Sequence, residues 1–204
     1  MNLSTLGQEE GTSPCLIAMF AVAVSLAIPA RAVGQEHVDP MAATVAEWFT
    51  GIEESFIALA EAMPAEKYEF KPTNGAFEGV RTFGEQVKHV ACNNFAMFNE
   101  IEKKEPPQSC GAGGPSPART KAELLAYLRD SFAYADRVLR TMTPANALEP
   151  AGGPYGGKST RLGLTTAAVW HASDHYGQLV MYLRMNGIVP PASRRAPASP
   201  ASSN

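Results

Sequence analysis

Residues 164–183 read LTTAAVWHASDHYGQLVMYL and contain the pattern on which the fold prediction rests. Apolar side chains recur there every three or four residues, which is the spacing of one face of an α-helix. With successive residues placed about 100° apart around the axis, four of them fall within about 60° of one another: Leu164, Ala168, Leu179 and Tyr182. The pattern predicts an amphipathic helix over roughly 162–186, with this face buried.

Two histidines lie in the middle of that buried face. His171 and His175 fall about 20° to either side of its centre, four residues apart. Burying two imidazoles without partners is costly, because each ring carries a donor and an acceptor that lose water. Two histidines at this spacing on one helical face can bind one metal ion together. Core histidines that are hydrogen-bonded to hydroxyl groups are the alternative interpretation.

Three further amphipathic helices are predicted upstream. The first has an apolar stripe made of Val45, Trp48, Phe49, Ile52, Phe56, Leu59, Ala60 and Met63, and it ends at Pro64. The second and third begin at Thr82 and Thr120, each of which is followed three residues later by a glutamate, the pattern of a capping box. Gly187 and the prolines after it end the fourth helix. The fold class is therefore all-α, a four-helix bundle.

The connections between these helices are long, at 64–81, 105–119 and 143–161. Long links remove the constraint that consecutive helices be antiparallel neighbours, so a crossover is compatible with the sequence. Residues 67–71 alternate between charged and aromatic side chains over a short distance. We expect this segment to be an extended link.

His89 on the second helix is the candidate third metal ligand. Its direction lies about 140° from the centre of that helix's apolar stripe, beside Gln86 and Asn93. Such a polar stripe either faces solvent, which makes His89 an ordinary surface residue, or lines a polar cavity between helices. Periodicity alone slightly favours the surface.

The two histidine-bearing segments together resemble the DinB-like family. The resemblance is carried by Thr82-Phe-Gly-Glu-Gln-Val-Lys-His89 and by His171-Ala-Ser-Asp-His175-Tyr-Gly-Gln, with Gly187 and Pro190-Pro191 beyond. It extends from about residue 43 to residue 191. Members of that family are four-helix bundles, among them thiol S-transferases, and three histidines in them bind a divalent metal.

The resemblance implies that His89, His171 and His175 hold one divalent transition metal, such as Zn, Ni, Fe or Mn. It also implies that Gln86 and Asn93 point into the cavity, and that the protein forms a homodimer, as is common among the relatives. Three neutral imidazoles leave coordination positions open for water or substrate. An open divalent site can activate water, deprotonate a thiol or polarise a carbonyl.

The sequence thus predicts a metal-dependent hydrolase or transferase that acts on a small molecule of unknown identity. The alternative is a non-catalytic helical binding module in which the metal is structural or absent. No general base is evident. Six side chains are candidates for contacting the ligands or the substrate: Glu85, Gln86, Asn93, Tyr176, Gln178 and Tyr182. Capping explains Glu85 equally well, whereas Gln178, about 40° from the centre of the buried face, is expected to point inward.

The N-terminal region predicts export. An uncharged apolar run over 15–28 is followed by Ala30-Arg31-Ala32, the small–x–small pattern of a signal-peptidase site. We expect a signal peptide over 1–32, a bundle domain over 33–191 and a disordered tail over 192–204, with no membrane anchor left after processing. Cys92 and Cys110 remain in the mature chain, and an oxidising compartment permits them to pair, although two free thiols fit the spacing as well.

Composition excludes one broad class of function. The chain has 204 residues, 17 of them Lys or Arg and 20 Asp or Glu, which gives a formal net charge of −3. A nucleic-acid-binding protein needs a dense basic face, which this charge balance does not provide.

Overall fold

The computed structural model describes residues 38–153 and 158–194, and four long helices dominate these ranges. The helices are α1 (Pro40–Ala62), α2 (Phe83–Ile101), α3 (Lys121–Leu139) and α4 (Arg161–Met185). Three short 3-10 turns, η1 (Ala65–Lys67), η2 (Cys110–Ala112) and η3 (Pro191–Ser193), lie between and after them. Two residues of β1 (Pro150–Ala151) pair antiparallel with two of β2 (Ser159–Thr160) just before α4. The predicted all-α class is confirmed.

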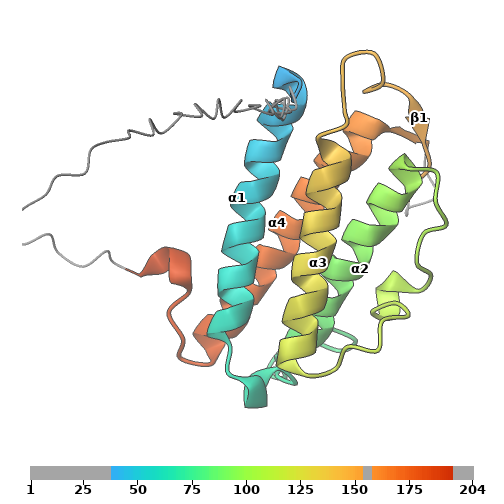
Figure 1. The fold of residues 1–204 in the computed structure, drawn as a ribbon. Coiled ribbons are helices and arrows are strands. Elements are labelled where there is room, and N and C mark those ends of the chain that lie inside the picture. Colours follow the sequence, from blue (N-terminus) through green and yellow to red (C-terminus); the bar gives the residue numbers. More distant parts are fainter. Residues whose placement is uncertain (1–37, 154–157, 195–204) are drawn as a thin grey trace, which may run out of the picture. The chain divides into compact units, whose positions relative to one another are not determined.

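The bundle contains one crossover, which Figure 1 shows. Helices α1 and α4 run in one direction, and α2 and α3 run parallel to each other in the opposite direction. The connection from α2 to α3 therefore returns along the outside of α2 before α3 begins (Figure 1). Helix α2 packs against α3 and α4, and α1 packs against the same two helices. One side of α2 is thus covered by a loop instead of a helix.

The helices begin where local capping chemistry predicts. Thr82 and Thr120 each accept a hydrogen bond from the backbone of the glutamate three residues later, whose side chain accepts one from the threonine backbone in return. At the other end of the chain, Gly187 follows α4 with a φ of 72°. A residue with a Cβ rarely adopts that left-handed conformation, so glycine is suited to this position.

The centre of the bundle is a cluster of aromatic rings. Phe49 of α1 lies 5.7 Å from Phe98 of α2 and 5.3 Å from Phe132 of α3, measured between ring centroids. All three side chains are fully buried, and burial of such a ring contributes on the order of 1.5–3 kcal/mol. These contacts fix how α2 sits in the bundle and hence which side of it faces α4.

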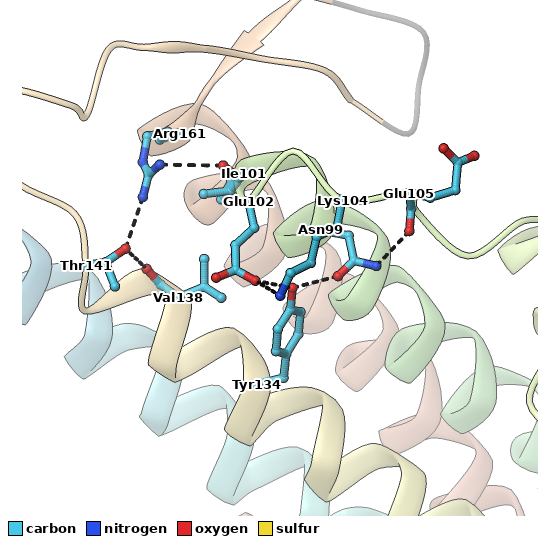
Figure 2. Close-up of polar contacts among 9 residues, drawn as sticks. All are labelled: Asn99, Ile101, Glu102, Lys104, Glu105, Tyr134, Val138, Thr141 and Arg161. Carbon is cyan, nitrogen blue, oxygen red and sulfur yellow. Dashed lines mark hydrogen bonds and ion pairs between the residues drawn. The ribbon is translucent and has the colours of Figure 1, made fainter.

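A polar cluster, which we call the Tyr134 cluster, ties the C-terminal end of α2 to α3 (Figure 2). The Tyr134 hydroxyl lies 2.6 Å from Asn99 Oδ1 and 2.8 Å from Glu102 Oε2, and Lys104 pairs with the Glu102 carboxylate. Nearby, Arg161 at the start of α4 donates to Thr141 Oγ1 at 3.0 Å (Figure 2). The ends of three helices are joined at this surface.

The expectation of an extended link over 67–71 is wrong. Residues 65–67 form η1, and the chain continues in a turn through Tyr68. The Tyr68 ring is buried 5.1 Å from that of Phe83, and its hydroxyl donates to the Ala60 carbonyl at 2.7 Å. An alternating pattern is typical of a strand that has one face on a sheet. Here no sheet is available to this segment among the described residues, and a turn places the Tyr68 ring in the core.

Both termini of the chain lie outside the described residues. The predicted signal peptide (1–32) belongs to this part, as do residues 195–204 of the predicted tail. The tail's first residues belong to η3, where Arg184 donates to Ser193 Oγ at 3.0 Å. The described residues thus extend to Arg194. Within the described ranges no helix is both long and apolar enough to span a membrane.

Candidate metal centre

Three buried histidines meet between α2 and α4. His89 projects from α2, while His171 and His175 project from neighbouring turns of α4. One ring nitrogen from each lies within 4.8 Å of those of the other two. The four-residue spacing on α4 and the packing of α4 against α2 produce this arrangement. The interpretation of His89 as a surface residue is therefore wrong.

The crossover connection explains why periodicity misplaced His89. Cys110 at the start of η2 forms a disulfide with Cys92, which lies about one turn beyond His89. Gly114, with a φ of 70°, passes so close that a Cβ there would stand 2.2 Å from Cys92 Sγ. The connection is thus held against the polar side of α2, and it buries a stripe that would otherwise face solvent.

Hydrogen bonds fix the proton position on two of the rings. His89 Nδ1 lies 2.8 Å from the backbone oxygen of Cys110, and His175 Nδ1 lies 2.8 Å from Gln86 Oε1. Because an oxygen of this kind only accepts, each Nδ1 carries the proton and donates. The other nitrogen, Nε2, is then left with a lone pair, which is the tautomer that a metal ligand needs.

His171 completes the set and is the least satisfied of the three. Its Nε2 lies 3.1 Å from His89 Nε2, while its Nδ1 is buried and has no hydrogen-bond partner in the part of the chain that the structure describes. Core histidines of the alternative interpretation would bond to hydroxyl groups, and no hydroxyl bonds these rings among the described residues. Nitrogens of one tetrahedral zinc site stand about 3.3 Å apart, so only small movements would adapt this set to an ion. The donor set therefore fits a divalent transition metal.

Burial keeps the three imidazoles neutral. It lowers the pKa of His171 to about 3 and that of His175 to about 4, with repulsion from the other histidines adding to the effect. The pKa of His89 is lowered for the same main reason, although the Cys110 carbonyl opposes the shift. Neutral rings near pH 7 bind a metal without first releasing a proton.

A cavity of about 600 Å³ opens onto the histidines. Its walls come from α2, α4, the segment before α2 and the disulfide-held connection. Besides the histidines it is lined by Arg81, Asn93, Ala96, Glu100, Pro106, Pro107, Gln108, Ser109, Cys110, Gly111, Trp170 and Asp174. This volume suits a small organic ligand, which would lie directly over the free nitrogens.

Two predicted neighbours support the histidines directly. Gln86 Oε1 accepts a hydrogen bond from His175 Nδ1, and the Asn93 side-chain amide donates to the His89 backbone oxygen at 3.0 Å. Both are buried, and Asn93 lines the cavity. Tyr182 is buried below the site, where its hydroxyl donates to the Arg81 backbone oxygen at 3.1 Å.

The other predicted neighbours are placed differently. Glu85 is used in the capping box and does not line the cavity. Tyr176 is half-buried against the core, also away from the cavity. Gln178 is exposed and its amide donates to Asp174 Oδ2 at 2.9 Å. Its side chain also lies within hydrogen-bonding reach of His175, where it raises the pKa of that ring, but it does not line the cavity.

Sequence reasoning missed Arg81, Trp170 and the segment 106–111, all of which line the cavity. Arg81 precedes α2 and the segment lies in the connection, so helical periodicity carries no signal for either. Trp170 is 63% exposed beside His171 and looks like an ordinary surface residue in the helical pattern. Only the cysteine spacing pointed to this loop.

The fold and the site together make this protein a four-helix bundle with a crossover connection and a candidate metal centre formed by three histidines. A sequence model of the DinB superfamily matches residues 49–179, more than half of the chain. The chain therefore belongs to the DinB superfamily. Among curated proteins, none matches it.

Two solved structures share the fold. A DinB-like protein from Bacillus cereus ATCC 10987 is 15% identical, with a TM-score of 0.59 over 72% of this chain and 93% of that one. A DinB-like protein from Bacillus subtilis is 20% identical, with a TM-score of 0.56 over 75% of this chain and 99% of that one. At these identities the likeness establishes the arrangement of helices.

Proposed function

We propose that the protein is an exported metal-dependent enzyme, a hydrolase or transferase that acts on a small molecule. The observation that carries the proposal is the convergence of one nitrogen from each of His89, His171 and His175 at the floor of an accessible cavity. A divalent transition metal held there would supply a Lewis acid that lowers the pKa of water or a thiol and polarises a carbonyl.

The chain's own residues supply orientation and shape. Gln86 and the Cys110 carbonyl hold two imidazoles in the ligand tautomer, so less ordering remains when an ion binds. The disulfide-held connection limits the access of water from one side. Asp174 and Glu100 are the two carboxylates that line the cavity.

The disulfide also supports the proposal of export. Disulfides persist in oxidising compartments and are rare in the cytosol. Together with the predicted signal peptide over 1–32, the Cys92–Cys110 bond favours a periplasmic or extracellular location. N-terminal sequencing of the protein recovered from its native host would then begin at Val33. A chain that retains residues 1–32 would contradict processing at this site.

The metal proposal is tested by elemental analysis of residues 33–204 purified without chelator or affinity tag. We expect about one divalent ion per chain, and none in a His171→Ala/His175→Ala variant. Ser173→Ala, an exposed change on the same helix, is the matched control and should keep the ion. Circular dichroism establishes that all three proteins are folded.

A folded wild-type protein that stays metal-free and refuses added zinc, nickel and manganese would overturn the metal-dependent enzyme. The remaining function would be that of a helical binding module. If the ion binds, hydrolysis and group transfer are screened with metal-loaded protein, and the double-histidine variant serves as the blank. If the double-histidine variant were as active as the wild-type protein, the activity would not depend on the histidine centre.

A further inference from the structure

Arg81 is the positively charged side chain among the residues that line the cavity. It lies just before the capping threonine of α2, and both its Nε and its Nη2 donate to the Gly111 backbone oxygen, at 3.2 and 2.9 Å. Its own backbone oxygen accepts from Tyr182. The guanidinium is therefore held at the cavity wall by backbone contacts.

Among the described residues, the charge of Arg81 is not paired with an opposite charge. Asp174, across the same cavity, instead accepts from Gln178. A guanidinium has five N–H donors, and the contacts to Gly111 use two of them. Several donors thus remain free at the cavity.

Arg81 and the three histidines line the same cavity. A cation held by the imidazoles and the guanidinium of Arg81 would therefore be two positive charges facing one space, and like charges repel. An anion bound between the two would offset this repulsion.

We propose that Arg81 binds the carboxylate of a small organic acid that is the substrate or ligand of this cavity. This inference deepens the proposed function, on which it rests for the neighbouring ion. A planar guanidinium matches a carboxylate with two parallel hydrogen bonds. A monoanion also fits the charge balance better than a dianionic phosphate, because Glu100 and Asp174 already line the cavity.

The remainder of the ligand meets an apolar wall. Trp170, Pro106, Pro107 and Ala96 line the same cavity as Arg81, and the Trp170 side chain is exposed there. A carboxylic acid with a hydrocarbon or aromatic portion would satisfy both parts. The segment Cys110–Gly111 prepares the site, since one of its carbonyls orients His89 and the next holds Arg81.

The test compares two probes of nearly equal shape, 3-phenylpropanoate and its neutral amide, by calorimetric titration of the metal-loaded protein. We expect the acid to bind at least tenfold more tightly than the amide, because a charge-assisted bidentate contact is lost in the amide. Arg81→Met should abolish this preference, and Arg81→Lys should restore part of it. Arg119→Met, the same loss of charge at an exposed position outside the cavity, should leave it unchanged.

Metal content is measured in every sample, so the two proposals fail separately. Equal affinity of wild-type protein for acid and amide, or a preference that survives in Arg81→Met, would overturn the role of Arg81 while the bound ion leaves the proposed function intact. Absence of the ion from wild-type protein overturns the proposed function, whatever the probes show. The titration is repeated after the metal has been removed with a chelator. We expect both probes to bind more weakly and the preference for the acid to remain, because Arg81 is still present.

Discussion

The Tyr134 cluster and the histidine centre are both polar contacts that join α2 to a neighbouring helix, yet they differ in how fully they are satisfied. Tyr134, Asn99 and Glu102 complement one another as donor and acceptors at the surface. In the histidine centre, ring nitrogens of three buried histidines converge, and His171 Nδ1 has no hydrogen-bond partner among the described residues.

This difference separates a contact that serves the fold from one that serves a ligand. A polar group buried without a partner costs on the order of 1–3 kcal/mol, so a structure retains it where something else compensates. The Tyr134 cluster is complete without any further component. The histidine centre, in contrast, leaves His171 Nδ1 without a partner among the described residues, as expected of a site that binds an ion under the proposed function.

The largest effect is expected from pH, because the two regions respond in different ranges. Unfolded histidines take up protons near pH 6.5, whereas the folded chain holds the pKa of His171 at about 3 and that of His175 at about 4. Below pH 6.5 the unfolded state therefore binds more protons, and the metal-free protein loses stability as the pH falls. Between pH 7 and pH 5 the loss is about 2 kcal/mol for each ring, about 4 kcal/mol together.

Urea unfolding of the metal-free protein at the two pH values measures this loss. A His171→Gln/His175→Gln variant should lose the part of this pH dependence that the two rings contribute. Hydrogen bonds from Lys104 and Tyr134 lower the pKa of Glu102 from its usual 4.5. The carboxylate of the Tyr134 cluster therefore stays ionised between pH 7 and pH 5. Equal pH dependence in wild type and variant would show that these rings do not resist protonation.

The disulfide ranks second. Its removal in Cys92→Ala/Cys110→Ala frees a loop that spans a sequence separation of 18, which lowers stability by about 3 kcal/mol. Because the Cys110 carbonyl also orients His89, zinc affinity should fall by about 10- to 100-fold. Denaturant unfolding and zinc titration give the two numbers. Unchanged zinc affinity with lowered stability would show that the connection does not orient His89.

Metal binding itself ranks third. Free zinc at 100 times its dissociation constant should raise stability by about 2.7 kcal/mol, because the ion binds the folded chain. For a chain of this size the rise corresponds to about 5–10 °C in Tm. Thermal unfolding with and without zinc measures it, and His89→Ala should show no rise. An equal rise in His89→Ala would place the ion elsewhere.

What the sequence predicted was governed by local chemistry. The capping boxes at Thr82 and Thr120 depend on residues three apart, so they could be recognised without the fold. The pairing of His171 with His175 likewise follows from one helix. Such features need no knowledge of which element lies opposite.

What the sequence did not predict depends on elements outside the helices. Periodicity detects burial against other helices, so it could not foresee that the connection pinned by Cys110 covers His89. The same limit applies to Gln178, which lies near the buried face in the helical pattern but is exposed among the described residues. Arg81 was missed because it lies in an irregular segment, and its partner is a backbone oxygen that any residue could provide.

The smallest effect is expected from the Tyr134 cluster. Tyr134→Phe removes one hydroxyl from a partly exposed set of hydrogen bonds and should cost about 1 kcal/mol. Zinc affinity and the pH dependence between pH 7 and pH 5 should not change. Denaturant unfolding beside zinc titration checks both. A loss of zinc binding in this variant would mean that the two regions are coupled through α2.

The position of Trp170 gives the cavity an optical reporter. The chain has two tryptophans, of which Trp170 lines the cavity beside His171, while Trp48 lies on α1 outside it. An ion with unpaired d electrons, such as Ni²⁺ or Cu²⁺, quenches indole emission at short range. Occupancy can thus be followed in the unlabelled chain as quenching that vanishes in Trp170→Phe and persists in Trp48→Phe.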